Sequence, residues 1–225
     1  MIVDFGTQTL ESPFIQSIYQ ARSVGGGSFT STAVSNWEMV ITKQKGMTIL
    51  SIRGPETKTS PSPIPKDAEF LGITFKHGTF MPSLPVRKLV DKAIHVPESV
   101  KNSFQLFGDT WEFPNPENVD VFVNRLLRND LLIHDQVVDD VLRGKTQDLS
   151  LRSVQRRFVQ VTGLTYKTIQ QIERARQAVA LLQSGAPILE TTYQAGYFDQ
   201  AHLTNSLRRF YGQTPAQIIQ SANSA

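Results

Sequence analysis

The sequence contains no cysteine, which excludes a disulfide framework, a zinc site with thiolate ligands and a cysteine nucleophile. It also lacks any apolar run approaching the roughly 18–20 residues that a membrane span requires. Its first ten residues, MIVDFGTQTL, include an acidic residue and lack the basic start and apolar centre of a secretory signal. These absences predict a cytoplasmic protein that makes no contact with a membrane.

Catalytic and metal-binding patterns are missing as well. The histidines His77, His95 and His134 lie far apart, and none has a metal-ligand spacing such as His-x-His. The triple glycine at 25–27 is not followed by Lys-Ser/Thr, as a phosphate-binding loop would be, and no nucleophile elbow is present. The sequence therefore predicts no metal, no cofactor and no enzymatic activity.

The charge of the chain changes along its length. Residues 1–142 contain 13 Lys/Arg against 16 Asp/Glu, whereas residues 143–225 contain 10 against 4, so a net charge of −3 is followed by +6. Many ordinary domains carry such a charge. A basic second half behind an acidic first half nevertheless favours a polyanionic partner for the second half.

The first 115 residues are typical of a β-rich domain. Residues 36–43 (NWEMVITK) and 47–54 (MTILSIRG) are rich in β-branched and aromatic residues and flank a short break, which predicts a β-hairpin. Residues 69–76 (EFLGITFK) are a further strand candidate, and the proline-rich segment 54–66 is predicted to be a surface loop or an edge segment. Short strands with such breaks predict a sandwich or a barrel-like fold.

Helical periodicity begins near residue 117 and continues almost to the end of the chain. Apolar residues recur there at i, i+3, i+4, i+7 and i+8 and form one amphipathic face: Val119, Phe122, Val123, Leu126 and Leu127. A length of 225 residues is itself typical of two domains. We therefore predict an α+β protein, with a β-rich domain at 1–130 and an all-α domain at 131–225.

Two sixteen-residue segments of the helical part, SLRSVQRRFVQVTGLT (150–165) and DQAHLTNSLRRFYGQT (199–214), share a pattern at an offset of 49 residues. Each begins at a good helix N-cap, Ser150 or Asp199, and each reaches a glycine that can end the helix in a left-handed cap. Apolar residues at i, i+4 and i+7 predict one buried stripe on each helix. The stripes are Val154, Phe158 and Val161 in the first helix and Leu203, Leu207 and Phe210 in the second.

A shorter predicted helix precedes each segment, at 134–144 and at 187–196. A short helix, a tight turn and a helix with an exposed polar face make up a helix-turn-helix motif. The predicted helix that links the two motifs has roughly 15–17 residues and spans about 25 Å at 1.5 Å per residue. Successive major-groove segments on one side of B-DNA are roughly 34 Å apart, so we expect one chain to read two turns of one duplex.

Three runs of the helical part carry a resemblance to a known family: SLRSVQRRFVQVTGLT, ERARQAVALL and AGYFDQAHLTNSLRRFYGQTPAQI, the last of which includes Gly-x-Thr-Pro at 212–215. Over about 135–220 the chain resembles the paired helix-turn-helix module of the AraC/XylS family of bacterial transcription regulators. The first half, at RGPET and FLGITFKHG, resembles the cupin-like effector and dimerisation domains of such regulators. The resemblance implies a DNA-binding transcription factor, not an enzyme, with a cupin-like N-terminal domain.

The sequence departs from the family pattern at two places in the second motif. Thr191 and Thr192 stand where the family prefers Ile-Ala, and an alanine there lets the two helices of the motif approach closely. Asn205 stands where relatives commonly have an arginine.

The helical repeat also predicts which side chains meet DNA. The second helix of each motif, which is expected to lie in the major groove, is called its reading helix. In the first reading helix Arg152 and Arg156 lie nearly opposite the buried stripe, with Gln155 beside them. The resemblance implies base-reading residues at these three positions. An arginine pairs with guanine O6/N7 and a glutamine with adenine N6/N7. The alternative is that these residues are solvated helix surface, which a helix-turn-helix context makes the less favoured interpretation. Arg157 is expected to be a phosphate contact or a solvated charge.

In the second reading helix the outward residues are Ala201, Asn205 and Arg208, flanked by Gln200 and His202. An alanine offers a methyl group to thymine and an asparagine reads adenine. His202 is expected either to contact DNA or to lie at the rim of the interface. Arg208 and Arg209 are expected to bind phosphates, which adds affinity and orientation but no sequence choice, or to be solvated charges.

The resemblance also implies partners for the two domains. Beside double-stranded DNA we expect a small-molecule effector of the N-terminal domain, with Trp37 and Arg53 as pocket residues, RNA polymerase if the protein is an activator, and a second copy of the chain. The alternative class is a cupin-like small-molecule-binding protein or enzyme with a helical assembly domain, which as a metal enzyme would need a clustered His/Glu set. A repair enzyme fused to the DNA-binding module does not fit, because its alkyl-acceptor chemistry needs a cysteine and the sequence has none.

Overall fold

The computed structural model describes residues 2–8 and 12–223. The chain forms two compact units, and each draws on more than one stretch of the sequence. The first contains Met1–Ser28, Asn36–Pro55 and Pro63–Thr165, and the second contains Phe29–Ser35, Glu56–Ser62 and Tyr166–Ala225.

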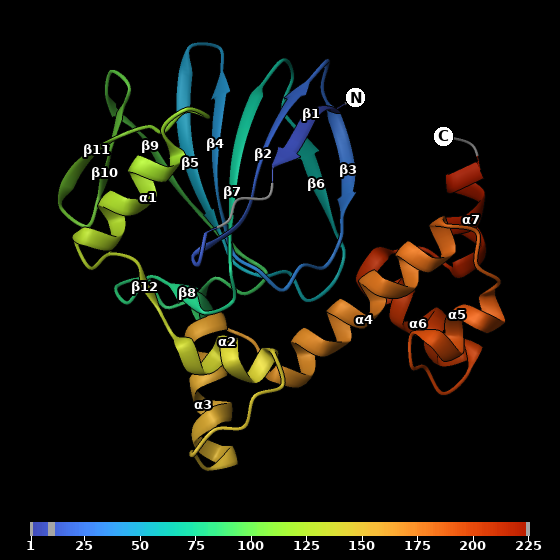
Figure 1. Cartoon of the computed structure of the whole chain (residues 1–225). Helices are drawn as coiled ribbons and strands as arrows, with labels where there is room; N and C mark the ends of the chain where they lie inside the picture. The colour runs from blue at the N-terminus through green and yellow to red at the C-terminus, as the bar shows by residue number, and fades with distance from the viewer. Residues whose placement is uncertain (1, 9–11, 224–225) are drawn as a thin grey trace. The chain divides into compact units, whose positions relative to one another are not determined.

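The first unit is built on an antiparallel sheet of eight strands in the order β1-β2-β7-β4-β5-β9-β10-β11 (Figure 1). These strands are β1 (Ile2–Gln8), β2 (Ile15–Ser23), β4 (Glu38–Gln44), β5 (Met47–Arg53), β7 (Glu69–Phe75), β9 (Ala93–Val100), β10 (Ser103–Leu106) and β11 (Asp109–Glu112). The β4–β5 hairpin turns at Lys45 and Gly46, whose φ angles are 49° and 78°. Two successive positive φ angles are what a two-residue hairpin of type I′ requires.

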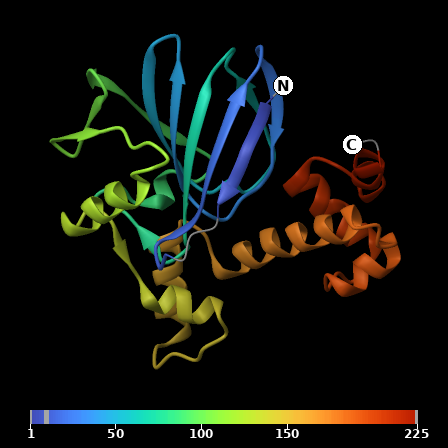
Figure 2. The ribbon, with the colours of Figure 1, turned by 45° about the horizontal axis from the view of Figure 1, so that its top comes forward.

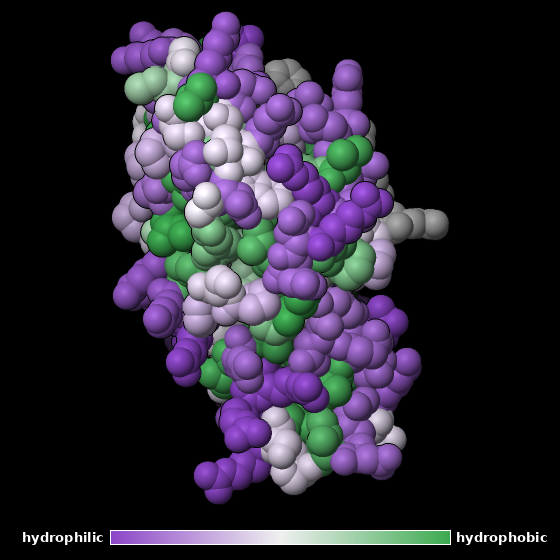
Figure 3. Space-filling view, turned by 90° about the vertical axis from the view of Figure 1, so that its left-hand side faces the viewer, coloured by the Kyte–Doolittle hydropathy of each residue, from purple (hydrophilic) through white to green (hydrophobic). Residues whose placement is uncertain are grey.

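One face of this sheet carries the hydrophobic core of the first unit. Ile73 pairs with both Ile18 and Met39 on the neighbouring strands, so the three side chains share this face. Helix α1 (Val119–Arg128) covers this face near the β10–β11 end of the sheet (Figure 1). Phe122 and Leu126 of α1 join the core, as do Phe104 of β10 and Trp111 of β11. Viewed from this side, the surface is mainly hydrophilic and its hydrophobic residues lie in small patches (Figure 3).

Short elements and two helices complete the first unit. Strand β8 (Thr79–Phe80) pairs with β12 (Ile133–His134), and η1 (Val86–Lys88) is a single turn of 3-10 helix. They are followed by α2 (Gln136–Leu142) and α3 (Leu151–Thr162). Helix α3 packs against both α2 and η1, so the first predicted reading helix rests on the β-rich part of the chain.

The second unit contains α4 (Tyr166–Gln183), α5 (Ile188–Gln194), α6 (Gln200–Tyr211) and α7 (Pro215–Asn223). Figure 2 shows α4 as one long helix, with the other three grouped at its C-terminal part. Among the residues that the structure describes, no helix combines the length and the apolar character needed to cross a membrane.

Residues from the first half of the sequence also belong to the second unit. They come from the two-stranded sheet of β3 (Gly27–Ser31) and β6 (Ser60–Ile64) and the segments beside it. The backbone N–H groups of Ala33 and Thr59 donate to the carbonyl oxygens of Phe210 (2.8 Å) and Arg209 (3.0 Å). Because the last carbonyls of a helix have no partner within the helix, these two bonds stabilise the C-terminal end of α6.

The predicted α+β class, with a β-rich part followed by a helical part, is confirmed. The hairpin predicted at 36–54 is β4–β5, the strand predicted at 69–76 is β7, and the amphipathic face near 119–127 is α1. The segment 54–66, predicted as a loop or an edge, contains β6, where Pro61 and Pro63 are tolerated because β6 pairs with β3 alone. The first compact unit extends to Thr165, and the boundary at 130 between a β-rich and a DNA-binding domain stays a prediction.

Candidate nucleic-acid interface

The two predicted reading helices begin and end in the same way. The side chain of Ser150 accepts a hydrogen bond from the N–H of Ser153 (3.2 Å), and that of Asp199 accepts one from the N–H of His202 (2.7 Å). Both helices end at a glycine in the left-handed conformation, Gly163 with φ 76° and Gly212 with φ 71°. The caps predicted from the 49-residue offset are therefore confirmed.

The buried stripes are also equivalent, with one difference. Phe158 and Val161 of α3 are buried, as are the three stripe residues of α6, Leu203, Leu207 and Phe210. Val154, the first stripe residue of α3, is only half-buried. Each helix therefore has one face fixed in a core and the opposite face available to solvent.

In the first motif, an ion pair joins the start of α2 to α3. Asp135 caps α2 by accepting from the N–H groups of Val137 (3.0 Å) and Val138 (3.2 Å), and its other oxygen lies 2.7 Å from Nε of Arg157 on α3. The Arg157 guanidinium is thus ion-paired within the motif although the residue is exposed, and its contact with a phosphate stays a prediction. On the other side of α2, Nε2 of His134 lies 3.0 Å from a carboxylate oxygen of Asp139.

In the second motif, the corresponding contacts are apolar or neutral. Helix α5 begins after Pro187, and the Tyr197 hydroxyl lies 2.9 Å from that of Ser206 on α6. The Tyr197 ring also packs edge-on against the ring of His202, 5.1 Å between centroids. Burial raises the pKa of Tyr197 above its ordinary value, so the Tyr197 hydroxyl stays uncharged near neutral pH.

Thr191 and Thr192 are both buried on α5, at the place where the sequence departs from the family pattern. The Thr192 hydroxyl donates to the carbonyl oxygen of Ile188 at 2.7 Å. The Thr191 hydroxyl has no hydrogen-bond partner within the part of the chain that the structure describes. The second motif therefore carries an unsatisfied buried polar group, which costs stability.

The side chains predicted to meet DNA lie on the exposed faces of α3 and α6. Every one of them is exposed: Arg152, Gln155 and Arg156 on α3, and Gln200, Ala201, His202, Asn205 and Arg208 on α6. His202 also contacts Tyr197, as described above, so its ring is partly fixed within the motif. Contact of these residues with bases or phosphates stays a prediction.

The sequence reasoning missed two exposed apolar residues beside these faces. Leu149 precedes the N-cap Ser150 and is 42% exposed, and Phe198 precedes the N-cap Asp199 and is 87% exposed. The signal was present in the sequence, because the same 49-residue offset that aligns the caps also aligns these two residues.

The two residues expected to bind an effector have different surroundings. Trp37 is 3% exposed, stacks on Phe75 with 4.1 Å between centroids and donates its indole N–H to the carbonyl oxygen of Thr79. Arg53 is half-buried and lies 3.6 Å from a carboxylate oxygen of Glu38. Glu38 also accepts from the hydroxyl of Tyr19 at 3.0 Å.

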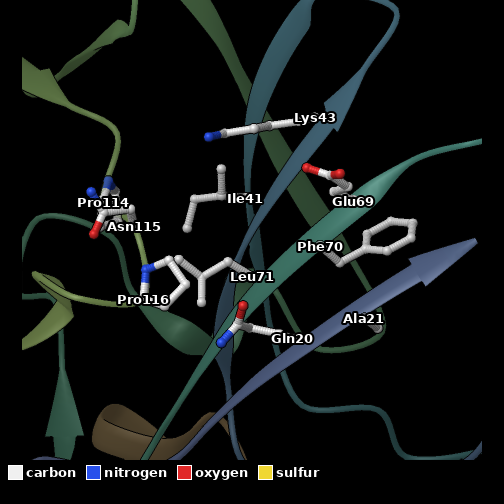
Figure 4. A pocket seen from close by; sticks show the side chains of 10 residues that line it. All are labelled: Gln20, Ala21, Ile41, Lys43, Glu69, Phe70, Leu71, Pro114, Asn115 and Pro116. Carbon is white, nitrogen blue, oxygen red and sulfur yellow. The ribbon is translucent and has the colours of Figure 1, made fainter. Parts of the chain in front are cut away.

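A pocket of about 250 Å³ lies on the core face of the sheet, beside the segment that leads into α1 (Figure 4). The buried side chains of Ile41 and Leu71 lie at its centre, and Lys43 and Glu69 supply charged groups from neighbouring strands. Other lining residues are Gln20, Ala21, Phe70, Pro114, Asn115 and Pro116, so neither Trp37 nor Arg53 is among them. In the described ranges, 2–8 and 12–223, no group of three or more His, Asp or Glu is placed to hold a metal ion.

Two equivalent helix pairs, each with a capped second helix and an exposed polar face, define the chain as a paired helix-turn-helix protein. Proteins of this class place the second helix of each motif in the major groove. A family model described as "Helix-turn-helix domain" matches residues 145–221. The matched domain is of the AraC type, which confirms the resemblance to AraC/XylS regulators over this segment.

Solved structures of ToxT from Vibrio cholerae are similar to the chain over most of its length. ToxT from strain O395 is 8% identical, with a TM-score of 0.39, and the match covers 92% of this chain and 98% of that one. ToxT bound to (E)-4-(8-methylnaphthalen-1-yl)but-3-enoic acid is 10% identical, with a TM-score of 0.42 and coverage of 91% and 97%. Wild-type ToxT from strain SCE256 with a bound unsaturated fatty acid is 9% identical, with a TM-score of 0.39 and coverage of 90% and 93%.

A TM-score below 0.5 marks a loose superposition, so no property of ToxT is carried to this chain. Among curated protein sequences, none matches the chain.

Proposed function

We propose that the protein is a transcriptional regulator, not an enzyme, and that it binds specific DNA sequences by reading two successive major-groove segments of one duplex. The observation that carries the proposal is the equivalence of α3 and α6. Each has a side-chain N-cap, a buried stripe and a left-handed glycine, and each exposes polar side chains opposite the stripe. A helix of this kind meets base edges with its N-terminal half.

The exposed residues of α3 fit direct readout of base pairs. Arg152 and Arg156 have the donor geometry for guanine O6/N7, and Gln155 has the donor and acceptor that adenine N6/N7 require. Arg157 has no base-reading part in this proposal, because Asp135 holds it 2.7 Å away within the motif.

Helix α6 offers weaker readers. Asn205 suits adenine, and Ala201 brings a methyl group toward thymine. We assign Gln200 to a base edge, and His202, Arg208 and Arg209 to phosphates, which position the protein without selecting a sequence.

The β-rich part is proposed to bind a small-molecule effector. The pocket of about 250 Å³ combines the apolar side chains of Ile41 and Leu71 with the charged groups of Lys43 and Glu69. Known ligand pockets have a volume of roughly 300–1,000 Å³, so a small effector fits best. Arg53, whose side chain is 39% exposed, stays a candidate contact, whereas Trp37 is committed to the core by its stacking and its hydrogen bond.

The division at residue 130 is retained as part of this proposal, with effector binding in 1–130 and DNA binding in 131–225. Fragment 131–225 is then expected to fold and to bind the operator. In this account the regulator acts in the cytoplasm, self-associates as a homodimer, and contacts RNA polymerase if it is an activator. Size-exclusion chromatography of the full chain tests the homodimer.

The experiment that tests DNA binding is selection of duplexes from a random library by the full-length protein, followed by titration at several salt concentrations. We expect an enriched sequence with two parts, and an affinity that falls steeply as salt rises, because phosphate contacts release counterions. Failure to enrich any sequence, or an affinity independent of salt, would refute the proposal.

A further inference from the structure

Each reading helix is preceded by an exposed apolar side chain at the same position. Leu149 stands immediately before Ser150 and Phe198 immediately before Asp199, and the two residues are separated by the same 49 positions as the helices. Leu149 is 42% exposed and Phe198 is 87% exposed. Among the described large apolar residues, Phe198 has the greatest exposure, which is unfavourable in water without a partner.

The usual role of an apolar residue at this position does not account for Phe198. A residue before the N-cap commonly packs on the fourth residue of the helix and fixes the entry of the chain. In α6 that fourth residue is Leu203, which is fully buried. A ring that is 87% exposed gives it little cover, so other side chains bury Leu203 and the Phe198 ring is left in solvent.

The position of Phe198 indicates its partner. The N-terminal residues of the second helix in a helix-turn-helix motif contact base edges, and Phe198 adjoins the exposed residues Gln200 and Ala201 at that end of α6. The side chain of Asp199 between them is occupied by the N–H of His202 (2.7 Å). The apolar feature of the major groove is the C5-methyl group of thymine, and phenylalanine is one of the side chains that contact it.

We propose that Phe198 reads a thymine through its C5-methyl group, and that Leu149 is its smaller counterpart in the first motif. This inference rests on the proposed function, because it places Phe198 within the DNA interface of the second motif. It adds an apolar reader to a helix on which no arginine is assigned to a base edge. It also explains why a large apolar side chain is tolerated in solvent at this position.

The test uses the full-length protein and the duplex that it selects. Each thymine is replaced in turn by uracil, which removes only the C5-methyl group. For the wild type we expect one replacement in the half-site of the second motif to weaken binding about four-fold, the equivalent of one buried methyl group. Phe198→Ala should weaken binding to the unmodified duplex and abolish the effect of that replacement.

Tyr193→Ala is the matched control, because Tyr193 is an exposed aromatic residue of the same motif, 67% exposed on α5. It should retain the wild-type response to uracil. Circular dichroism should show that both variants are folded, since neither removes a buried side chain.

Three results would overturn the inference. Phe198→Ala binds like the wild type; it weakens binding but keeps the uracil effect, which would indicate a contact with the sugar–phosphate backbone; or the wild type shows no uracil effect at any thymine. A protein that selects no duplex at all would refute the proposed function itself, and this inference with it. In the first three cases the proposed function would stand.

Discussion

The two helix-turn-helix motifs have equivalent second helices but differ in the contacts that join their two helices. In both, a side-chain oxygen caps the second helix and a left-handed glycine ends it. The first motif is held by an ion pair, between Asp135 and Arg157, whereas the second has a hydroxyl pair and an edge-on aromatic contact at Tyr197. The caps and buried stripes are therefore common to both motifs, whereas the contact between the two helices is ionic in the first and uncharged or aromatic in the second.

The exposed faces of the two motifs also differ, in the residues that they offer to base pairs. The residues assigned to base edges are two arginines and a glutamine on α3, whereas on α6 they are Gln200, Ala201 and Asn205 and include no arginine. The second motif also contains the unsatisfied Thr191 hydroxyl. The first motif is therefore expected to dominate sequence discrimination.

The largest effects are expected on the free energy of unfolding, from substitutions in the buried stripes of α3 and α6. Phe158→Ala removes a fully buried ring from the stripe of α3 and should lower the free energy of unfolding by about 3–5 kcal/mol. Leu207→Ala, at the equivalent position of α6, should cost about 2–5 kcal/mol. Urea unfolding measures both, with Leu151→Ala, 81% exposed on α3, as a control within about 0.5 kcal/mol of wild type. A loss below that of the control at either buried site would show that the stripes are not equivalent.

The next largest effect on stability is expected from alanine substitutions of the glycines that end α3 and α6, and it should differ between the two motifs. Alanine at either position must adopt a left-handed conformation, at a cost of about 1–2 kcal/mol. A Cβ at Gly163 would also lie 3.1 Å from the backbone nitrogen of Arg87, whereas at Gly212 the nearest atom is a methyl carbon of Thr30 at 3.4 Å. Gly163→Ala should therefore be the more destabilising in thermal unfolding, and equal losses would contradict the packing of α3 against η1.

Smaller effects are expected on DNA affinity, from single substitutions in the two reading helices. We expect Arg156→Ala to weaken specific binding about ten-fold or more and to relax preference at one or two base pairs, because a bidentate contact is worth about 1–3 kcal/mol. Asn205→Ala should cost less than about 1.5 kcal/mol. Titration of both variants against one operator at one salt concentration decides the order. If Asn205→Ala is the more damaging, the ranking of the helices is wrong, although the paired motifs would stand.

The smallest effect is expected at the threonine pair of α5. Thr191→Val removes a buried hydroxyl that has no partner among the described residues, and should stabilise the protein by about 1 kcal/mol. Thr192→Val is the matched variant and should destabilise by about 0.5–1.5 kcal/mol, because it removes the 2.7 Å bond to Ile188. Denaturant unfolding measures both, and destabilisation by Thr191→Val would show that its hydroxyl is satisfied in solution.

The sequence predicted the elements that depend on neighbouring residues. The caps Ser150 and Asp199, the closing glycines and the β4–β5 hairpin follow from local rules and were all found. Strands β9, β10 and β11 were not singled out, because two of them have only four residues and their pairing is set by distant partners.

Among the candidate site residues, exposure could be predicted but partners could not. The helical repeat correctly placed Arg152, Gln155 and Arg156 in solvent. It could not show that Arg157 would pair with Asp135, because that choice depends on how α2 lies against α3. For the same reason the pocket beside α1 was missed, since its lining comes from strands and a loop far apart in the sequence.

Hydroxyl-radical and guanine-methylation footprinting of the selected duplex shows whether one chain reads two successive major-groove segments. We expect two protected segments on one face of the DNA, about 10–10.5 base pairs apart. Arg156→Ala should lose protection in one of them and keep it in the other. A single protected segment, or two that Arg156→Ala weakens equally, would contradict this expectation.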